Sequence, residues 1–193
     1  MRADAVQRRE AIIGHARHVF AARGGDVALE AVAAASGVGI ATLYRNFPSR
    51  DDLIRAVIED MVREILAIVA EARAAAAKDP AEAWKGLLAR LMEMELGALT
   101  DGLVLQAGAG TDAAGASPLV QIQQPALDAL EELLTILKRT NAVRTSITAP
   151  GVIVAVATIT RPQAPAIRDA APGVPGELAE AYLLWSSARI NPR

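Results

Sequence analysis

The pattern of apolar and polar positions predicts helices along most of the chain. Apolar side chains recur at helical spacing over residues 5–23, and two shorter segments, from about residue 28 and over residues 40–47, continue the pattern. Ser36-Gly37-Val38-Gly39 separates the two short segments, and a glycine there can adopt the left-handed conformation that ends a helix. The pair is therefore predicted to form a helix-turn-helix, whose second helix can enter the major groove of DNA.

A longer amphipathic segment follows the break at Pro48-Ser49. Ser49 is placed to cap it, and Asp51 and Asp52 fall in its first turn, where negative charge favours the helix dipole. The segment is predicted to be one helix from about residue 50 to 77, which would extend about 40 Å. Asp26 is likewise expected to cap the helix that begins near residue 28.

The rest of the pattern predicts an all-α fold. Further helices are expected over residues 80–100, 118–140 and 176–189. Residues 150–160 are rich in β-branched side chains and could form a strand, but a single strand has no partner, so a buried helix is predicted. Pro125 is expected to kink or divide its helix. Residues 108–118, rich in small residues, and residues 161–176, rich in proline, are predicted loops.

The charge distribution supports a division into two functional parts. Residues 1–50 carry seven basic and four acidic residues, a net charge of +3, whereas the remainder carries 13 basic and 18 acidic residues, a net charge of −5. A basic end on an acidic body orients a molecule toward phosphate. We therefore expect a helix-turn-helix DNA-binding domain at residues 1–49 and a helical domain at residues 50–193.

The segment from Thr42 to Leu53 resembles the recognition-helix signature of TetR-type (tetracycline-repressor-like) transcriptional regulators. It has a Thr-Leu-Tyr run, two variable residues, the aromatic Phe47, a short polar break, and the basic Arg50 at the start of a long helix. Phe20 near the end of the first helix, followed by Arg23-Gly24, also fits the family. The resemblance covers roughly residues 8 to 60. Asn46 stands where many members have His, and Arg50 where many have Lys, which leaves the base preference open.

The predicted DNA-binding residues lie on the second short helix and at the start of the long one. Arg45 can pair with guanine and Asn46 with adenine, whereas Thr42 and Tyr44 offer hydroxyl groups to phosphate. The full predicted set is Gly39, Ile40, Ala41, Thr42, Tyr44, Arg45, Asn46 and Arg50. Leu43 and Phe47 are expected to pack in the core. Without the signature, the same residues would also fit an ordinary helical corner with solvated side chains.

The resemblance implies a ligand pocket and a dimer face in the C-terminal domain. The ligand-binding candidates are Trp84, Leu88, Met92, Leu103 and Gln106, each of which could instead be an ordinary core residue. The dimer candidates are Val152, Val156, Ile159, Tyr182 and Trp185. The expected partners are a double-stranded DNA operator of palindromic sequence, a second copy of the chain and a small-molecule effector that releases the DNA.

Several function classes are disfavoured by the sequence. There is no cysteine and no histidine after His18, so an enzyme, a metal site or a cofactor is not expected. No apolar run approaches the roughly 20 residues of a membrane span, and an apolar signal segment is lacking, so a cytoplasmic protein without a membrane partner is expected. A small-molecule carrier whose helix-turn-helix is only structural and a transcriptional activator remain as alternatives to a repressor.

Overall fold

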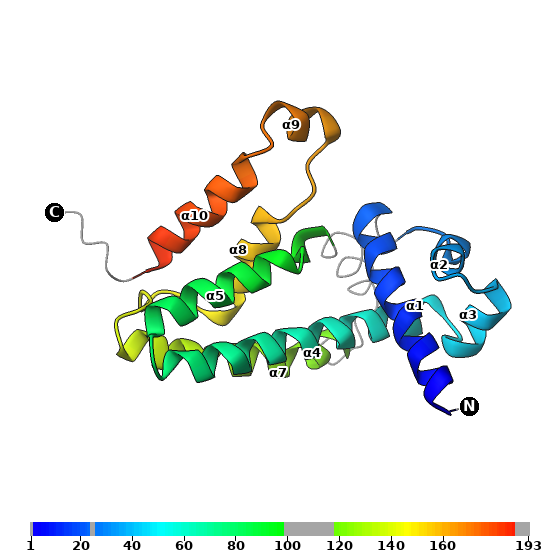
Figure 1. Ribbon diagram of the computed structural model, residues 1–193, viewed down its shortest axis with the longest axis horizontal. Coiled ribbons are helices and arrows are strands. Elements are labelled where there is room, and N and C mark those ends of the chain that lie inside the picture. Colours follow the sequence, from blue (N-terminus) through cyan, green and yellow to red (C-terminus); the bar gives the residue numbers. More distant parts are fainter. Residues whose placement is uncertain (1, 24–25, 99–117, 188–193) are drawn as a thin grey trace. The chain divides into compact units, whose positions relative to one another are not determined.

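The computed structural model describes residues 2–23, 26–98 and 118–187, and its regular elements there are helices (Figure 1). The helices are α1 (Arg2–Arg23), α2 (Leu29–Ala35), α3 (Ile40–Asn46), α4 (Arg50–Ala76), α5 (Pro80–Glu93), α7 (Pro118–Arg139), α8 (Ala149–Ile159), α9 (Pro165–Ala170) and α10 (Val174–Ser186). Within these ranges the only extended pairing is an isolated bridge between Val143 and Ser187. The all-α class and the long helix after Pro48 are confirmed. None of the described helices is both long and apolar enough to cross a bilayer.

Contacts divide the chain into two compact units, residues 1–62 with 98–123 and residues 63–97 with 124–193. The first unit contains α1, α2, α3 and the beginning of α4. Its core includes the completely buried Phe20, Val32 and Leu43, and Phe47 is only 1% exposed. Leu43 and Phe47 are therefore core residues, as predicted. The expected functional boundary at residue 49 stays a prediction.

The N-terminus of α4 is closed by a reciprocal cap. The Ser49 hydroxyl accepts a hydrogen bond from the Asp52 backbone N–H at 3.1 Å, and the Asp52 carboxylate accepts one from the Ser49 N–H at 3.1 Å. This arrangement satisfies donors that a helix start leaves open, and it confirms the predicted cap. The expected cap by Asp26 is wrong: α2 begins at Leu29, so Ala28 occupies the cap position and no side chain caps it.

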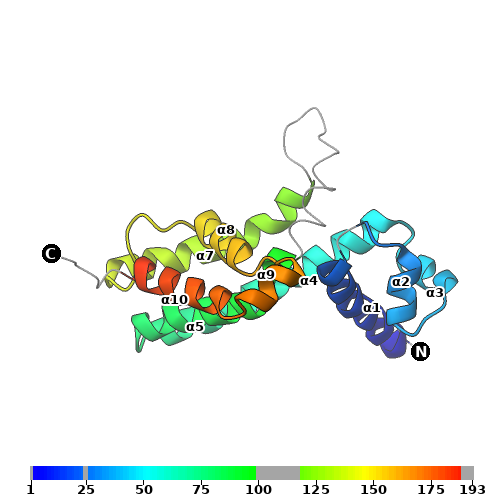
Figure 2. The same ribbon diagram turned by 90° about the horizontal axis from the view of Figure 1, so that it is seen from above.

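The second unit contains the rest of α4 with α5, α7, α8 and α10, and α5, α8 and α10 contact one another (Figure 2). Its fully buried large side chains include Trp84, Leu87, Leu91, Leu130, Leu133 and Leu134. The β-branched segment is helical, as predicted: the Thr148 hydroxyl caps α8, and Pro150 lies in its first turn. Proline is tolerated there because the first-turn N–H groups have no partner within the helix.

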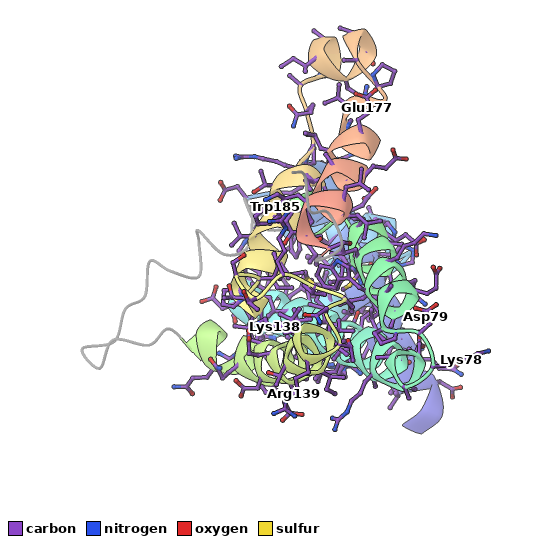
Figure 3. The ribbon with its side chains drawn as sticks, turned by 90° about the vertical axis from the view of Figure 1, so that its left-hand side faces the viewer. Lys78, Asp79, Lys138, Arg139, Glu177 and Trp185 are labelled. Atoms are coloured by element: carbon purple, nitrogen blue, oxygen red, sulfur yellow. The ribbon has the colours of Figure 1, made fainter. Side chains whose placement is uncertain are left out.

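The expected loop over residues 161–176 is partly wrong, because it contains α9 and the start of α10. Pro165 opens α9 and Pro175 lies in the first turn of α10, so both prolines start helices instead of excluding them. We call residues 161–173 the α9 arm. All of its residues are exposed, and in Figures 1 and 3 the arm projects beyond α5 and α8.

A buried hydrogen bond joins α5 to α10. The Trp84 indole N–H donates to the Ser186 hydroxyl at 3.0 Å, and this hydroxyl donates to the Leu183 carbonyl at 3.0 Å. Both Trp84 and Ser186 are shielded from solvent. Ser186→Ala should therefore leave the indole N–H without a partner and lower the free energy of unfolding by about 1–3 kcal/mol. Chemical denaturation would measure this loss.

The neighbouring serine provides the control for that substitution. The Ser187 hydroxyl donates to the Leu183 carbonyl at 2.8 Å and is only half-buried, so Ser187→Ala should cost clearly less than Ser186→Ala. Equal losses in the two variants would show that the Trp84 hydrogen bond contributes nothing particular to stability.

Glu131 on α7 ties this helix to the start of α8. Its carboxylate accepts a hydrogen bond from the Ala149 backbone N–H at 2.8 Å and from the Lys138 ammonium at 3.0 Å. Burial by itself raises the pKa of Glu131, but these two donors outweigh it and hold the pKa below the usual 4.5. The folded state therefore favours the charged carboxylate.

A pH dependence of stability follows from this contact. Because the folded-state pKa of Glu131 is lowered, its contribution is fully present above about pH 4.5 and is lost as the pH falls through the folded-state value. The effect should be small, because the Glu131 side chain is 44% exposed. The difference in unfolding free energy between the natural chain and Glu131→Gln should shrink as the pH falls below 4.5. A difference that does not vary with pH would refute the assignment.

Candidate nucleic-acid interface

The turn before α3 has the geometry of a helix-turn-helix. Gly37 has a φ of +65°, and its N–H donates to the Ala34 carbonyl while the Val38 N–H donates to the Ala33 carbonyl. These paired bonds end α2, and they place Gly37 in the left-handed backbone conformation that favours glycine. Gly39 then starts α3 in an extended conformation.

The packing of Leu43 determines which face of α3 meets solvent. Leu43 is completely buried, and the side chains on the opposite face point outward. Ala41 and Arg45 are exposed and Tyr44 is 46% exposed, whereas Ile40, Thr42 and Asn46 are half-buried. The predicted reading residues thus lie on one accessible short helix, held from behind by the core of the first unit.

Hydrogen bonds join the side chains of the two predicted base readers to the preceding turn of α3. The Arg45 guanidinium donates to the Ala41 carbonyl at 3.2 Å and to the Thr42 hydroxyl at 3.0 Å. The Asn46 amide donates to the Thr42 carbonyl at 2.8 Å. The Arg45 bonds are exposed to water, so exchanging them for bonds to a base edge costs little. Arg45 also has further N–H donors with which to do so.

Arg50 has a different environment from the α3 residues. It is half-buried, and its guanidinium donates to the Val27 carbonyl, so it braces the start of α4 against the segment before α2. Its predicted phosphate contact stays a prediction. The Arg9 guanidinium lies 4.7 Å from the centroid of the Phe47 ring, a cation–π contact that covers the residue ending α3. Sequence reasoning missed this pair, because nothing in the sequence links residues so far apart.

The predicted ligand-binding residues do not form one described pocket. Trp84 and Leu88 are almost completely buried. Met92 is half-buried and borders two of the described cavities. Leu88 and Met92 share a cavity of about 220 Å³ with Leu183. Leu103 and Gln106 lie outside the described residues. A second cavity of about 580 Å³ lies beneath the α9 arm, and a third of about 480 Å³ lies between α4 and α5.

The predicted dimer residues divide into two groups. Val152 and Val156 are completely buried within the chain itself, so the expectation that a second subunit covers them is wrong: their own core accounts for their apolar character. Ile159 and Tyr182 are half-buried, and burial raises the pKa of Tyr182. Trp185 is 50% exposed, with the Arg144 guanidinium 5.8 Å from its ring centroid.

Other apolar side chains on α8 and α10 are exposed and were not predicted. These are Val154, Leu178 and Leu184, each half or more exposed, and Val174, which is 42% exposed. In a helix, position 154 points away from positions 152 and 156, so a helical projection of the sequence could have separated the outer face of α8 from its inner face.

Potential metal-binding side chains do not form a metal site in the described part of the chain. Within those ranges, no group of three or more His, Cys, Asp or Glu side chains is arranged so that it could hold a metal ion. The Nδ1 atoms of His15 and His18 lie 2.7 and 2.8 Å from the carbonyl oxygens of Ala11 and Gly14, so each ring lies along its own helix.

The helix-turn-helix with an exposed α3, followed by a helical C-terminal part, is the architecture of a DNA-binding protein of the helix-turn-helix class. Residues 12–57 match the family model for bacterial regulatory proteins of the tetR family. The N-terminal part therefore carries a DNA-binding domain of the TetR type, and the chain as a whole is similar to solved TetR-type transcriptional regulators. Regulators of this family are generally not enzymes.

Solved structures support the same identification over nearly the whole chain. A TetR transcriptional regulator from Streptomyces coelicolor is 28% identical, with a TM-score of 0.62 over 94% of this chain and 99% of the other. A TetR transcription regulatory protein from Mycobacterium vanbaalenii is 28% identical, with a TM-score of 0.60 over 93% and 97%. The TetR-like regulator LfrR from Mycobacterium smegmatis, solved with proflavine, shares the fold at 21% identity, with a TM-score of 0.69 over 98% and 99%. No curated protein matches the chain.

Proposed function

We propose that this protein is a repressor that binds a palindromic operator as a homodimer and is released by a small molecule bound in its C-terminal helices. The observation that carries the proposal is the solvent-facing side of α3, where Tyr44 and Arg45 are exposed while Leu43 anchors the helix in the core. An exposed, firmly supported short helix with hydrogen-bonding side chains is what major-groove reading requires.

The roles of the α3 residues follow from their chemistry. Arg45 is proposed to read guanine and Asn46 adenine, each through two hydrogen bonds to the base edge. Thr42 and Tyr44 are proposed to contact phosphate, which fixes the register but carries no sequence information. Gly39, Ile40 and Ala41 form the leading end of the helix, and Arg50 is proposed to support the backbone contact.

A homodimer is proposed because apolar side chains of α8 and α10 face solvent in the single chain. Trp185 and Leu184 on α10 and Val154 on α8 are half or more exposed, and Ile159 and Tyr182 are half-buried. Covering these side chains with the same helices of a second copy would remove apolar surface from water. Two copies of α3 would then read half-sites about 34–36 Å apart, centre to centre.

Release by an effector is proposed to act through α4. This helix is continuous from Arg50 to Ala76 and contributes residues to both compact units. It directly follows residues 1–49, the proposed DNA-binding domain, and it is the first helix of residues 50–193, the proposed ligand and dimer domain. It is therefore the covalent connection between the two proposed functions. The effector must bind the DNA-free conformation more tightly than the DNA-bound one, because equal affinity shifts no equilibrium. Regulation of this kind places the protein in the cytoplasm with the chromosome.

The test is selection of bound duplexes from a random pool by the full chain, followed by binding measurements over a range of salt concentrations. We expect an inverted-repeat sequence with half-sites about one helical turn apart and an affinity that falls steeply with salt. Failure to enrich any sequence, with no retention on duplex DNA at low salt, would favour the carrier alternative. Activation in place of repression depends on the operator position, which a reporter assay with the selected sequence would determine.

A further inference from the structure

The cavity beneath the α9 arm has the size of a small-molecule site. It measures about 580 Å³ and lies between the C-terminal end of α5, the end of α8, the arm and the start of α10. Ligand sites in proteins usually occupy about 300–1,000 Å³. Figure 3 shows Glu177, in the first turn of α10, close to the arm and well away from Arg139 at the end of α7.

The lining of this cavity exposes apolar side chains that have little cover in the chain itself. Ile167 on the arm is 58% exposed, Val174 is 42% exposed and Leu178 is 50% exposed. Met92 at the end of α5 borders the same space and is half-buried. A ligand with a compact apolar body would remove these side chains from water, and this burial would drive its binding.

The charged groups of the cavity favour an anion. Arg161 and Arg168 contribute two guanidinium groups, whereas Glu95 contributes one carboxylate. Arg168 pairs with its neighbour Asp169 at 3.4 Å, but both side chains are largely exposed, so the pair is weak and leaves further N–H donors on the guanidinium. A planar carboxylate matches the paired donors of arginine better than a neutral group of the same shape does.

We propose that the cavity beneath the α9 arm binds a compact apolar carboxylate through Arg168, and that such a molecule is the effector of this regulator. The assignment of an effector role rests on the function proposed above, whereas the binding itself does not. The site differs from the predicted ligand set: of the members of that set that the structure describes, only Met92 lines the cavity.

The experiment is calorimetric titration of the full chain with para-tert-butylbenzoate and with para-tert-butylbenzamide, which keeps the shape but lacks the charge. We expect saturable binding of the carboxylate and weaker binding of the amide. Arg168→Gln should weaken carboxylate binding about tenfold and leave amide binding nearly unchanged. Arg139→Gln, an exposed arginine outside the cavity, is the matched control and should behave like the natural chain. Both substitutions are at exposed positions, so both variants should fold.

The outcomes separate the cavity assignment from the proposed function. Absence of saturable carboxylate binding, or equal affinity in the natural chain and Arg168→Gln, would overturn the site. Duplex binding is measured in parallel, with and without the carboxylate. Duplex retention without carboxylate binding contradicts only the cavity assignment, whereas carboxylate binding by a chain that never retains duplex contradicts only the DNA-binding proposal. Saturable binding that leaves duplex affinity unchanged would refute the effector role.

Discussion

Arg45→Ala is expected to abolish preference for the selected operator while leaving the protein folded. Arg45 is exposed on α3, and its only described hydrogen-bond partners are the Ala41 carbonyl and the Thr42 hydroxyl on the same helix. Removing it therefore disturbs no core contact. A bidentate contact between arginine and guanine discriminates by about 1–3 kcal/mol, and the proposed dimer would lose it in both half-sites. The expected loss of operator affinity is thus about 2–6 kcal/mol.

The measurement compares operator and random duplex at fixed salt, because phosphate contacts dominate non-specific binding. Arg45→Ala should lose most of the difference between the two duplexes and little of its affinity for random duplex. Arg139→Ala removes one positive charge from the end of α7 and serves as the charge-matched control. If the two variants bind the operator equally well, Arg45 is not a base reader.

Gly97→Ala is expected to destabilise the second unit severely. A Cβ atom at this position would lie 2.0 Å from the Ala157 carbonyl oxygen, 2.4 Å from the Arg161 backbone N and 2.7 Å from the Arg161 Cα. All three atoms belong to the backbone at and after the end of α8, so no side-chain rotation can relieve the clash. The Gly97 N–H also donates to the Thr160 hydroxyl at 2.9 Å, and separation of the two segments would break this bond.

The expected loss in unfolding free energy for Gly97→Ala is about 3 kcal/mol or more, measured by chemical denaturation. Gly86→Ala is the matched control, because an added Cβ at Gly86 meets nothing within 4 Å and the residue lies inside α5. Alanine favours a helix interior over glycine, so this control should be stabilised by about 0.5–1 kcal/mol. A Gly97→Ala variant as stable as the natural chain would mean that α8 does not approach residue 97 closely.

Much of the fold could be predicted because its signals are local. The apolar spacing of the long helix, the glycine turn at Gly37 and the cap at Ser49 each involve residues within one or two helical turns of one another. Two predictions about local structure went wrong for the same kind of reason. Asp26 lies too far before α2 to cap it, and Pro165 and Pro175 lie in the first turns of α9 and α10 instead of preventing these helices. In both cases the residue type was informative, but its exact position relative to the helix start decided the outcome.

The candidate DNA-reading face could also be predicted, since the signature that begins at Thr42 includes Leu43 and Phe47, whose burial determines which side of α3 packs inward. The ligand and dimer residues could not be predicted as well. Apolar residues on α8 are found on both its faces, and the sequence does not say which face the other helices cover. Val152 and Val156 proved to be internal, whereas Val154 faces solvent.

The sequence by itself determined the helical class, the helix-turn-helix and the side chains presented by α3, because each follows from contacts between residues close together in the chain. Only the tertiary structure decided that Trp84 donates to Ser186, that Gly97 touches the backbone of α8, and that a cavity lies beneath the α9 arm. These features join segments separated by tens of residues along the chain. Their geometry depends on how whole helices pack, which no local spacing of residue types specifies.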